Sequence, residues 1–157
     1  MSAIRLLVLD VDGVLTDGKL YIGPDGQQWR SSHVRDGLGI KKLIAAGIEP
    51  VIISGRPAGG MAERMAALGI REQLWGHDDK WPALEPLLAR RDITPAQVAA
   101  MGDDEPDLAL MDRVGLGLCP ADAIPAVRAR ADFIADSAGG QGAVREAAEW
   151  LLEHHRP

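Results

Sequence analysis

Short apolar runs alternate along the chain with segments whose apolar residues recur at helical spacing. The runs predict strands at residues 4–9, 49–53, 73–75, 98–101, 114–118 and 132–134. The helical spacing predicts helices at residues 38–46, 61–68, 81–91, 107–112, 123–129 and 143–154. Because the two alternate without a linker or repeat, the pattern predicts one α/β domain over residues 1–157, a three-layer sandwich around a Rossmann-like parallel sheet.

Residues 19–34 break this alternation and predict a β-hairpin that projects from the sheet. Two short stretches containing apolar and aromatic residues flank residues 23–26, whose sequence Gly-Pro-Asp-Gly is typical of a turn. Tyr21 and Trp29 would be poorly covered on an isolated hairpin, which favours a subunit contact. Packing against the rest of the same chain is the alternative.

The first apolar run ends in two carboxylates, Asp10 and Asp12. A run that is apolar on both faces is typical of a strand inside a parallel sheet, and such sheets bind ligands beyond the carboxyl ends of their strands. Two carboxylates at this position favour a catalytic role in the cleavage of a phosphate ester. An ordinary Asp-Gly turn is the alternative for this motif taken alone.

Three further polar motifs follow later strands. Ser54 begins a Ser-Gly-Arg motif, Lys80 follows the third run, and Asp103 lies in a Gly-Asp-Asp motif after the fourth. Taken singly, a helix cap, a solvated lysine and a capped helix start explain them equally well. Because each follows a strand, all should meet Asp10 at one edge of the sheet, where they can hold a phosphoryl group and a hard metal ion.

This set of residues predicts hydrolysis in two steps. Asp10 attacks phosphorus, while Asp12 protonates the leaving oxygen and then takes a proton from the hydrolytic water. Mg²⁺, bound by Asp10, Asp103 and the backbone carbonyl of Asp12, neutralises the repulsion between the nucleophile and the phosphate. Ser54 donates a hydrogen bond to a phosphate oxygen, and Lys80 offsets the developing charge.

Two neighbouring carboxylates, Asp104 and Asp107, are expected to hold Lys80 or metal-bound waters in place. Pro106 between them is interpreted as a proline at the start of a helix. Residues 77–79, His-Asp-Asp, precede Lys80 and are interpreted as a polar loop, because no second histidine stands at metal-ligand spacing.

Composition narrows the function further. Lys and Arg total 17 against 23 acidic residues, a formal charge of −6, which argues against a nucleic-acid-binding surface. The single cysteine, Cys119, excludes an internal disulfide. No apolar run approaches the roughly 18 residues of a membrane span, and residues 1–5 leave no room for a signal peptide. The sequence therefore predicts a cytoplasmic protein without membrane or nucleic-acid partners.

The four motifs resemble those of the haloacid dehalogenase superfamily of phosphohydrolases, and the match spans nearly the whole chain. Residues 12–18, 34–40, 53–56 and 139–146 resemble the 3-deoxy-D-manno-octulosonate 8-phosphate phosphatases within it. This resemblance implies a small, capless, Mg²⁺-dependent enzyme of lipopolysaccharide precursor synthesis. It also implies a homotetramer in which the hairpins assemble centrally and a neighbouring subunit helps to close each site.

The resemblance further implies which residues contact the sugar phosphate. Besides Asp12, they are His33, Val34, Arg35, Asp36, Gly37, Lys41, Gly55, Arg56, Arg64 and Lys80. Arg56 is the leading candidate for specificity, because a guanidinium can grip the carboxylate or the phosphate of such a substrate with two hydrogen bonds. The resemblance assigns residues 139–142 to closing a neighbour's site, whereas their composition alone predicts a flexible lead into the last helix.

Two alternative functions remain open at this stage. One is a phosphatase for nine-carbon keto-acid sugar phosphates, such as the 9-phosphates of the deaminated and N-acylated neuraminic acids. The other is a non-catalytic module that keeps the fold for oligomerisation or binding, which the presence of all four motifs argues against.

Overall fold

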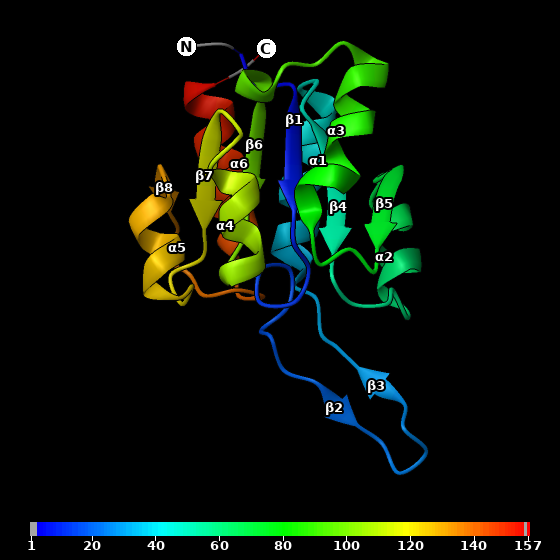
Figure 1. Ribbon diagram of the computed structural model, residues 1–157. Coiled ribbons are helices and arrows are strands. Elements are labelled where there is room, and N and C mark those ends of the chain that lie inside the picture. The colour runs from blue at the N-terminus through cyan, green and yellow to red at the C-terminus, as the bar shows by residue number, and fades with distance from the viewer. Residues whose placement is uncertain (1–2, 156) are drawn as a thin grey trace.

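The computed structural model describes residues 3–155 and 157 and contains a parallel sheet of six strands (Figure 1). Met1 and Ser2, which belong to the segment used for the signal-peptide prediction, lie outside the described residues. The strand order is β5-β4-β1-β6-β7-β8. The strands are β1 (Leu6–Leu9), β4 (Glu49–Ser54), β5 (Glu72–Trp75), β6 (Val98–Met101), β7 (Leu116–Cys119) and β8 (Phe133–Ile134).

Helices cover both faces of this sheet. The first face carries α1 (Val34–Ala45), α2 (Met61–Ala67) and α6 (Ala143–His154), and the second carries α3 (Lys80–Arg91), α4 (Glu105–Met111) and α5 (Pro125–Arg130). Along β1, Leu7 and Leu9 enter the first core and Leu6 and Val8 the second, as the alternation of a strand requires. The predicted three-layer α/β sandwich is confirmed.

Two helices begin at least two residues earlier than the sequence predicted. Helix α1 begins at Val34 rather than at residue 38, because the Nδ1 atom of His33 accepts a hydrogen bond from the backbone of Arg35. Helix α4 begins at Glu105, because the Asp104 carboxylate caps it. A short 3₁₀ helix, η1 (Pro95–Gln97), precedes β6. The spacing of apolar residues cannot predict the first turns of α1 and α4, because these turns are mostly polar.

The hairpin extends beyond the carboxyl ends of the strands, at the bottom of Figure 1. Its strands, β2 (Tyr21–Ile22) and β3 (Gln28–Trp29), are antiparallel and shorter than the predicted range of 19–34. Tyr21, Ile22 and Trp29 are 54%, 68% and 59% exposed. More than half of the surface of each of these three side chains is therefore left uncovered by the rest of the described chain.

Within the described residues, none of the helices is both long and apolar enough to traverse a lipid bilayer.

Candidate active site

A tight turn places Asp10 and Asp12 at the carboxyl edge of the sheet. Strand β1 ends at Leu9, and the backbone N–H of Asp10 still donates to the carbonyl of Met101 on β6, 3.1 Å away. In the β1 turn, residues 11–18, three successive N–H groups donate to the carbonyl of Val11, and the Thr16 hydroxyl accepts from Gly13 and Gly18. The turn is therefore held by its own hydrogen bonds.

The two carboxylates open into a cavity of about 300 Å³. The loops that follow β1, β4, β5 and β6 all contribute to its lining. The lining residues are Asp10, Asp12, Ser54, Gly55, Arg56, Asp78, Lys80, Asp103, Asp104, Pro106 and Asp107. The four motifs that are separate in the sequence thus lie together in one place.

Lys80 is the central cation of this cavity. It is the first residue of α3 and is buried, and its Nζ atom lies 3.0 Å from Oδ1 of Asp10 and 2.6 Å from Oδ1 of Asp107. Burial lowers the pKa of the ammonium, but the charges of Asp10 and Asp107 raise this pKa by more. Lys80 therefore stays protonated between two carboxylates.

Asp107 anchors this arrangement from the first turn of α4. Its Oδ2 atom accepts hydrogen bonds from the backbone N–H groups of Asp103 and Asp104, at 2.9 and 3.2 Å. Its Oδ1 atom accepts from Lys80. Gly102 is needed beside it, because a β-carbon there would collide with the Asp107 carboxylate. Both oxygens of Asp107 are occupied by protein donors.

The carboxylates of the cavity fit a divalent cation. Oxygens of Asp10, Asp103 and Asp107 lie within 4.8 Å of one another, and Oδ1 of Asp103 is buried with no hydrogen-bond partner among the described residues. Burial and the charges of neighbouring carboxylates raise the pKa of Asp103 to about 8. Burial and the charge of Asp107 raise that of Asp10 to about 6, against the opposing effect of Lys80. A hard cation would relieve this repulsion.

The segment before and within α1 does not reach the cavity lining. Asp36 is buried beneath α6, where its Oδ1 atom accepts a hydrogen bond from the backbone of Arg145, and burial raises its pKa. Gly37 lies against the guanidinium of Arg64. The other residues that the resemblance implied, His33, Val34, Arg35 and Lys41, are likewise absent from the lining of the cavity in this chain.

Two residues at the site were missed by the sequence reasoning. Arg30, directly after β3, donates hydrogen bonds to both carboxylate oxygens of Asp12. Asp78, interpreted as part of a polar loop, lines the cavity, with Oδ1 close to Gly55. In the sequence, only the position of Arg30 in the hairpin could have indicated that it contacts the site. For Asp78, the only such indication was its position two residues before Lys80.

The glycine segment 139–142 packs against the β1 turn of the same chain. The N–H of Gly140 donates to the carbonyl of Val14 at 3.0 Å, and the N–H of Gly139 donates to the Asp122 carboxylate at 2.9 Å. A β-carbon on Gly139 would collide with the carbonyl of Gly13. The prediction that residues 139–142 form a flexible segment before the last helix was wrong for this chain. Glycine is required here because the two backbones pack closely.

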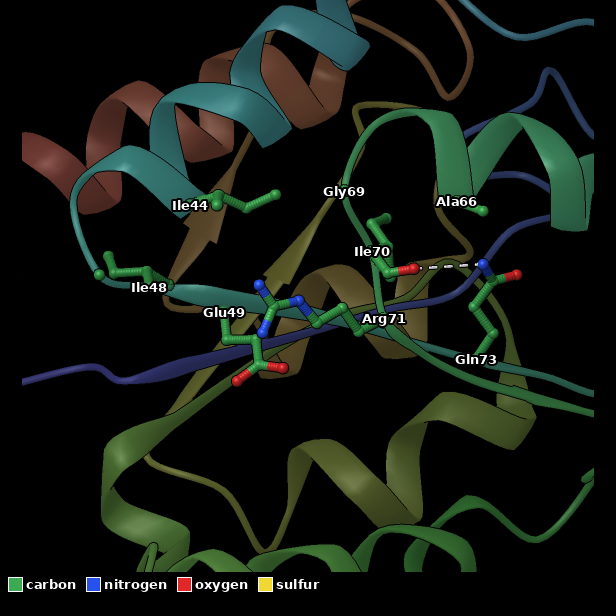
Figure 2. A pocket seen from close by; sticks show the side chains of 9 residues that line it. Ile44, Ile48, Glu49, Ala66, Gly69, Ile70, Arg71 and Gln73 are labelled. Atoms are coloured by element: carbon green, nitrogen blue, oxygen red, sulfur yellow. Dashed lines mark hydrogen bonds between the residues drawn. The ribbon is translucent and has the colours of Figure 1, made fainter.

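A larger cavity, of about 810 Å³, lies near the amino ends of β4 and β5 (Figure 2). Ile44, Ile48 and Ile70 form its apolar part, and Arg71 and Gln73 contribute polar groups. Its one carboxylate, that of Glu49, has no second acidic side chain beside it in the lining. The chemistry expected of a parallel sheet therefore belongs to the smaller cavity at the carboxyl ends.

Comparison with known proteins agrees with this geometry. The family model of haloacid dehalogenase-like hydrolases matches residues 74–147. The 3-deoxy-D-manno-octulosonate 8-phosphate phosphatase KdsC of Escherichia coli K12 is 46% identical over 149 residues, which cover 95% of this chain and 79% of that protein.

Solved structures extend the likeness to three dimensions. A probable YrbI family phosphatase from Pseudomonas syringae pv. phaseolica 1448a has a TM-score of 0.94 and 46% identity, over 97% of this chain and 86% of its own. The 3-deoxy-D-manno-octulosonate 8-phosphate phosphatase of Moraxella catarrhalis, in complex with magnesium, phosphate and KDO, has a TM-score of 0.92 and 37% identity, over 96% and 82%. The chain belongs to the haloacid dehalogenase-like hydrolases, and within them to the family of 3-deoxy-D-manno-octulosonate 8-phosphate phosphatases.

Proposed function

We propose that this enzyme hydrolyses 3-deoxy-D-manno-octulosonate 8-phosphate to the free sugar acid and phosphate, as a step of lipopolysaccharide precursor synthesis in the cytoplasm. The observation that carries the proposal is the cluster of Asp10, Lys80 and Asp103 in one cavity of a chain so similar to phosphatases of that name. The complex of the Moraxella relative with magnesium, phosphate and the sugar acid supports both the substrate and the cofactor.

In the first step, a carboxylate oxygen of Asp10 attacks phosphorus and the ester P–O bond breaks. Asp12 gives a proton to the departing sugar oxygen, which leaves phosphate covalently bound to Asp10. Lys80, 3.0 Å from Asp10, offsets the negative charge that gathers around the phosphoryl group. The Ser54 hydroxyl accepts from the backbone of Arg56 at 3.4 Å, so its own hydrogen is free to bond a phosphate oxygen.

In the second step, Asp12 takes a proton from water, and the water oxygen attacks phosphorus. The bond to Asp10 breaks, phosphate is released and the Asp10 carboxylate is restored. Asp10, Asp103 and the backbone carbonyl of Asp12 would hold Mg²⁺. When bound, this ion supplies positive charge that counters the repulsion between the phosphate dianion and the carboxylates.

Arg56 is the residue that we assign to the carboxylate end of the substrate. It lines the cavity beside Gly55, and its guanidinium has no hydrogen-bond or ion-pair partner among the described residues, so it is available for a ligand. A keto-acid sugar phosphate brings a second anionic group that such a guanidinium can bind. Nine-carbon keto-acid phosphates offer the same two groups and are the competing substrates.

The quaternary arrangement is part of the same proposal. The described residues form no cap domain over the cavity, and the hairpin beside it leaves three large apolar side chains exposed. Burying that surface between subunits would stabilise an oligomer, and a neighbouring chain would help to exclude water from the site. We assign a homotetramer, as the family resemblance implies.

Phosphate release by the purified protein with Mg²⁺ tests the function. We expect a higher kcat/KM on the eight-carbon 8-phosphate than on the nine-carbon 9-phosphates, and loss of turnover in Asp10→Asn. Preference for a nine-carbon substrate would overturn the substrate assignment. Equal phosphate release from wild type and Asp10→Asn would overturn catalysis through an aspartyl phosphate.

A further inference from the structure

Arg30 joins the hairpin to the site at two points. One guanidinium nitrogen, Nη1, donates to Oδ2 and Oδ1 of Asp12 at 3.1 and 3.3 Å. The other, Nη2, donates to the backbone carbonyls of Pro57 and Ala58 at 2.9 and 2.6 Å. The side chain is only 8% exposed although it leaves a hairpin that is otherwise open to solvent. Arg30 therefore contacts the β1 turn and the loop after β4 at once.

This geometry limits the orientations that the Asp12 carboxyl group can adopt. A carboxyl group at the end of an aspartate rotates freely about its last torsion unless its oxygens are held. Here one donor contacts both oxygens, and two carbonyls fix the donor from the other side. A lysine has a single nitrogen on a flexible stem and could not reproduce this planar, two-ended arrangement.

We infer that Arg30 is a positioning residue, which acts on the reaction by orienting Asp12 toward the oxygen of the leaving group. The inference rests on the proposed function, since it requires Asp12 to transfer the proton. Arg30 does not line the cavity, whereas Asp12 does, so the path from Arg30 to the substrate runs through Asp12. The hairpin thereby supplies an internal part of the catalytic site as well as an exposed surface.

A pair of aryl phosphates with different leaving groups tests this role. Phenolate is a poor leaving group that needs a proton, whereas 2,4-dinitrophenolate leaves without one. We expect Arg30→Gln to lower kcat/KM for phenyl phosphate by about 10- to 100-fold at saturating Mg²⁺. This is less than the roughly 10²- to 10⁴-fold that general acid catalysis contributes, because Asp12 itself is still present. The value for 2,4-dinitrophenyl phosphate should change much less. Arg30→Lys keeps the charge but not the two-ended contact, so it should show a loss on phenyl phosphate similar to that of Arg30→Gln.

kcat/KM is the right quantity, because it covers the steps up to the first departure of a leaving group and excludes hydrolysis of the aspartyl phosphate. Lys19→Gln, which removes an exposed cation from the base of the same hairpin, is the matched control and should leave both values unchanged. Circular dichroism and melting curves of the variants report whether the fold is retained.

The double variant Asp12→Asn/Arg30→Gln separates action through Asp12 from direct contact with substrate. If Arg30 works through Asp12, its loss adds no further decrease in the Asp12→Asn background. A further decrease there, or equal losses on the two aryl phosphates in Arg30→Gln, would overturn the inference. Because neither aryl phosphate carries the sugar, failure of the proposed substrate would leave this result interpretable.

Discussion

The Lys80 ammonium lies 3.0 Å from Oδ1 of Asp10, within a cavity whose other ionisable side chains are mostly acidic. Asp107 fixes the position of the Lys80 ammonium, because it binds Lys80 with one oxygen and the backbone of the β6–α4 loop with the other. The positive charge is therefore in place before a substrate arrives. Such preorganised charge costs no reorganisation during the reaction.

Replacing Lys80 should consequently affect turnover. We expect Lys80→Met to lower kcat by roughly 10²- to 10³-fold, the range seen when one preorganised electrostatic group is removed. Lys42→Met removes an exposed lysine that pairs with Glu149 at the surface and should leave kcat unchanged. Steady-state phosphate release measures both variants. Comparable kcat values for Lys80→Met and wild type would contradict a role for Lys80 in offsetting charge.

The metal-free protein should lose stability as the pH rises. The pKa of Asp103 is about 8 in the folded chain, against 3.8 as its ordinary value. Between these values the unfolded chain releases the proton that the folded chain still binds, so ionisation favours unfolding progressively from about pH 4 to 8. Asp10, with a pKa of about 6, contributes in the lower part of this window.

Melting temperatures with a chelator and with Mg²⁺ check this effect. The stabilisation by Mg²⁺ should grow from about pH 5 to 8, because the cation binds the ionised carboxylates. Asp103→Asn should show a flatter pH dependence without metal and a much smaller response to Mg²⁺. A Mg²⁺ response that Asp103→Asn retains in full would exclude Asp103 as a ligand.

Gly139 should be intolerant of any side chain. A β-carbon would meet the carbonyl of Gly13 in the β1 turn, so Gly139→Ala must displace the turn that carries Asp12. We expect a loss of about 1–3 kcal/mol in the free energy of unfolding, as for overpacking elsewhere, together with reduced kcat. Gly60→Ala is the matched control, since no atom lies within 4 Å of the added carbon and its backbone is helical. Denaturant unfolding of the two variants measures the difference. Equal free energies of unfolding for Gly139→Ala and Gly60→Ala would refute the close packing of Gly139 against the β1 turn.

The sequence predicted the sheet and the convergence of the four motifs for a common physical reason. Each motif directly follows a buried apolar strand, and parallel strands bring their carboxyl ends to one edge. Asp10 and Lys80, 70 positions apart in the sequence, are therefore neighbours by topology alone. Their proximity does not depend on the conformation of any loop.

The contacts that depend on loop conformation were out of reach of the same reasoning. Arg30 reaches Asp12 only because the hairpin returns beside the β1 turn, and Asp78 lines the cavity only because the loop after β5 bends toward Gly55. The burial of Asp36 beneath α6 likewise depends on helix packing. Apolar periodicity carries no signal for any of these.

The exposed hairpin gives a last prediction, on assembly. Tyr21 and Trp29 pair across one face of the hairpin, and Ile22, 68% exposed, lies on the opposite face, so both faces are apolar. Ile22→Glu should place a charge in the proposed subunit contact and weaken it, because an unpaired charge is costly to bury. Gln27→Glu adds the same charge at a polar position of the same hairpin. Sedimentation velocity at equal protein concentration should show a smaller species for Ile22→Glu, whereas Gln27→Glu should sediment like the wild type. If a neighbour closes the site, the phosphatase activity of Ile22→Glu should fall in parallel. An Ile22→Glu variant with the sedimentation coefficient of the wild type would rule out this contact.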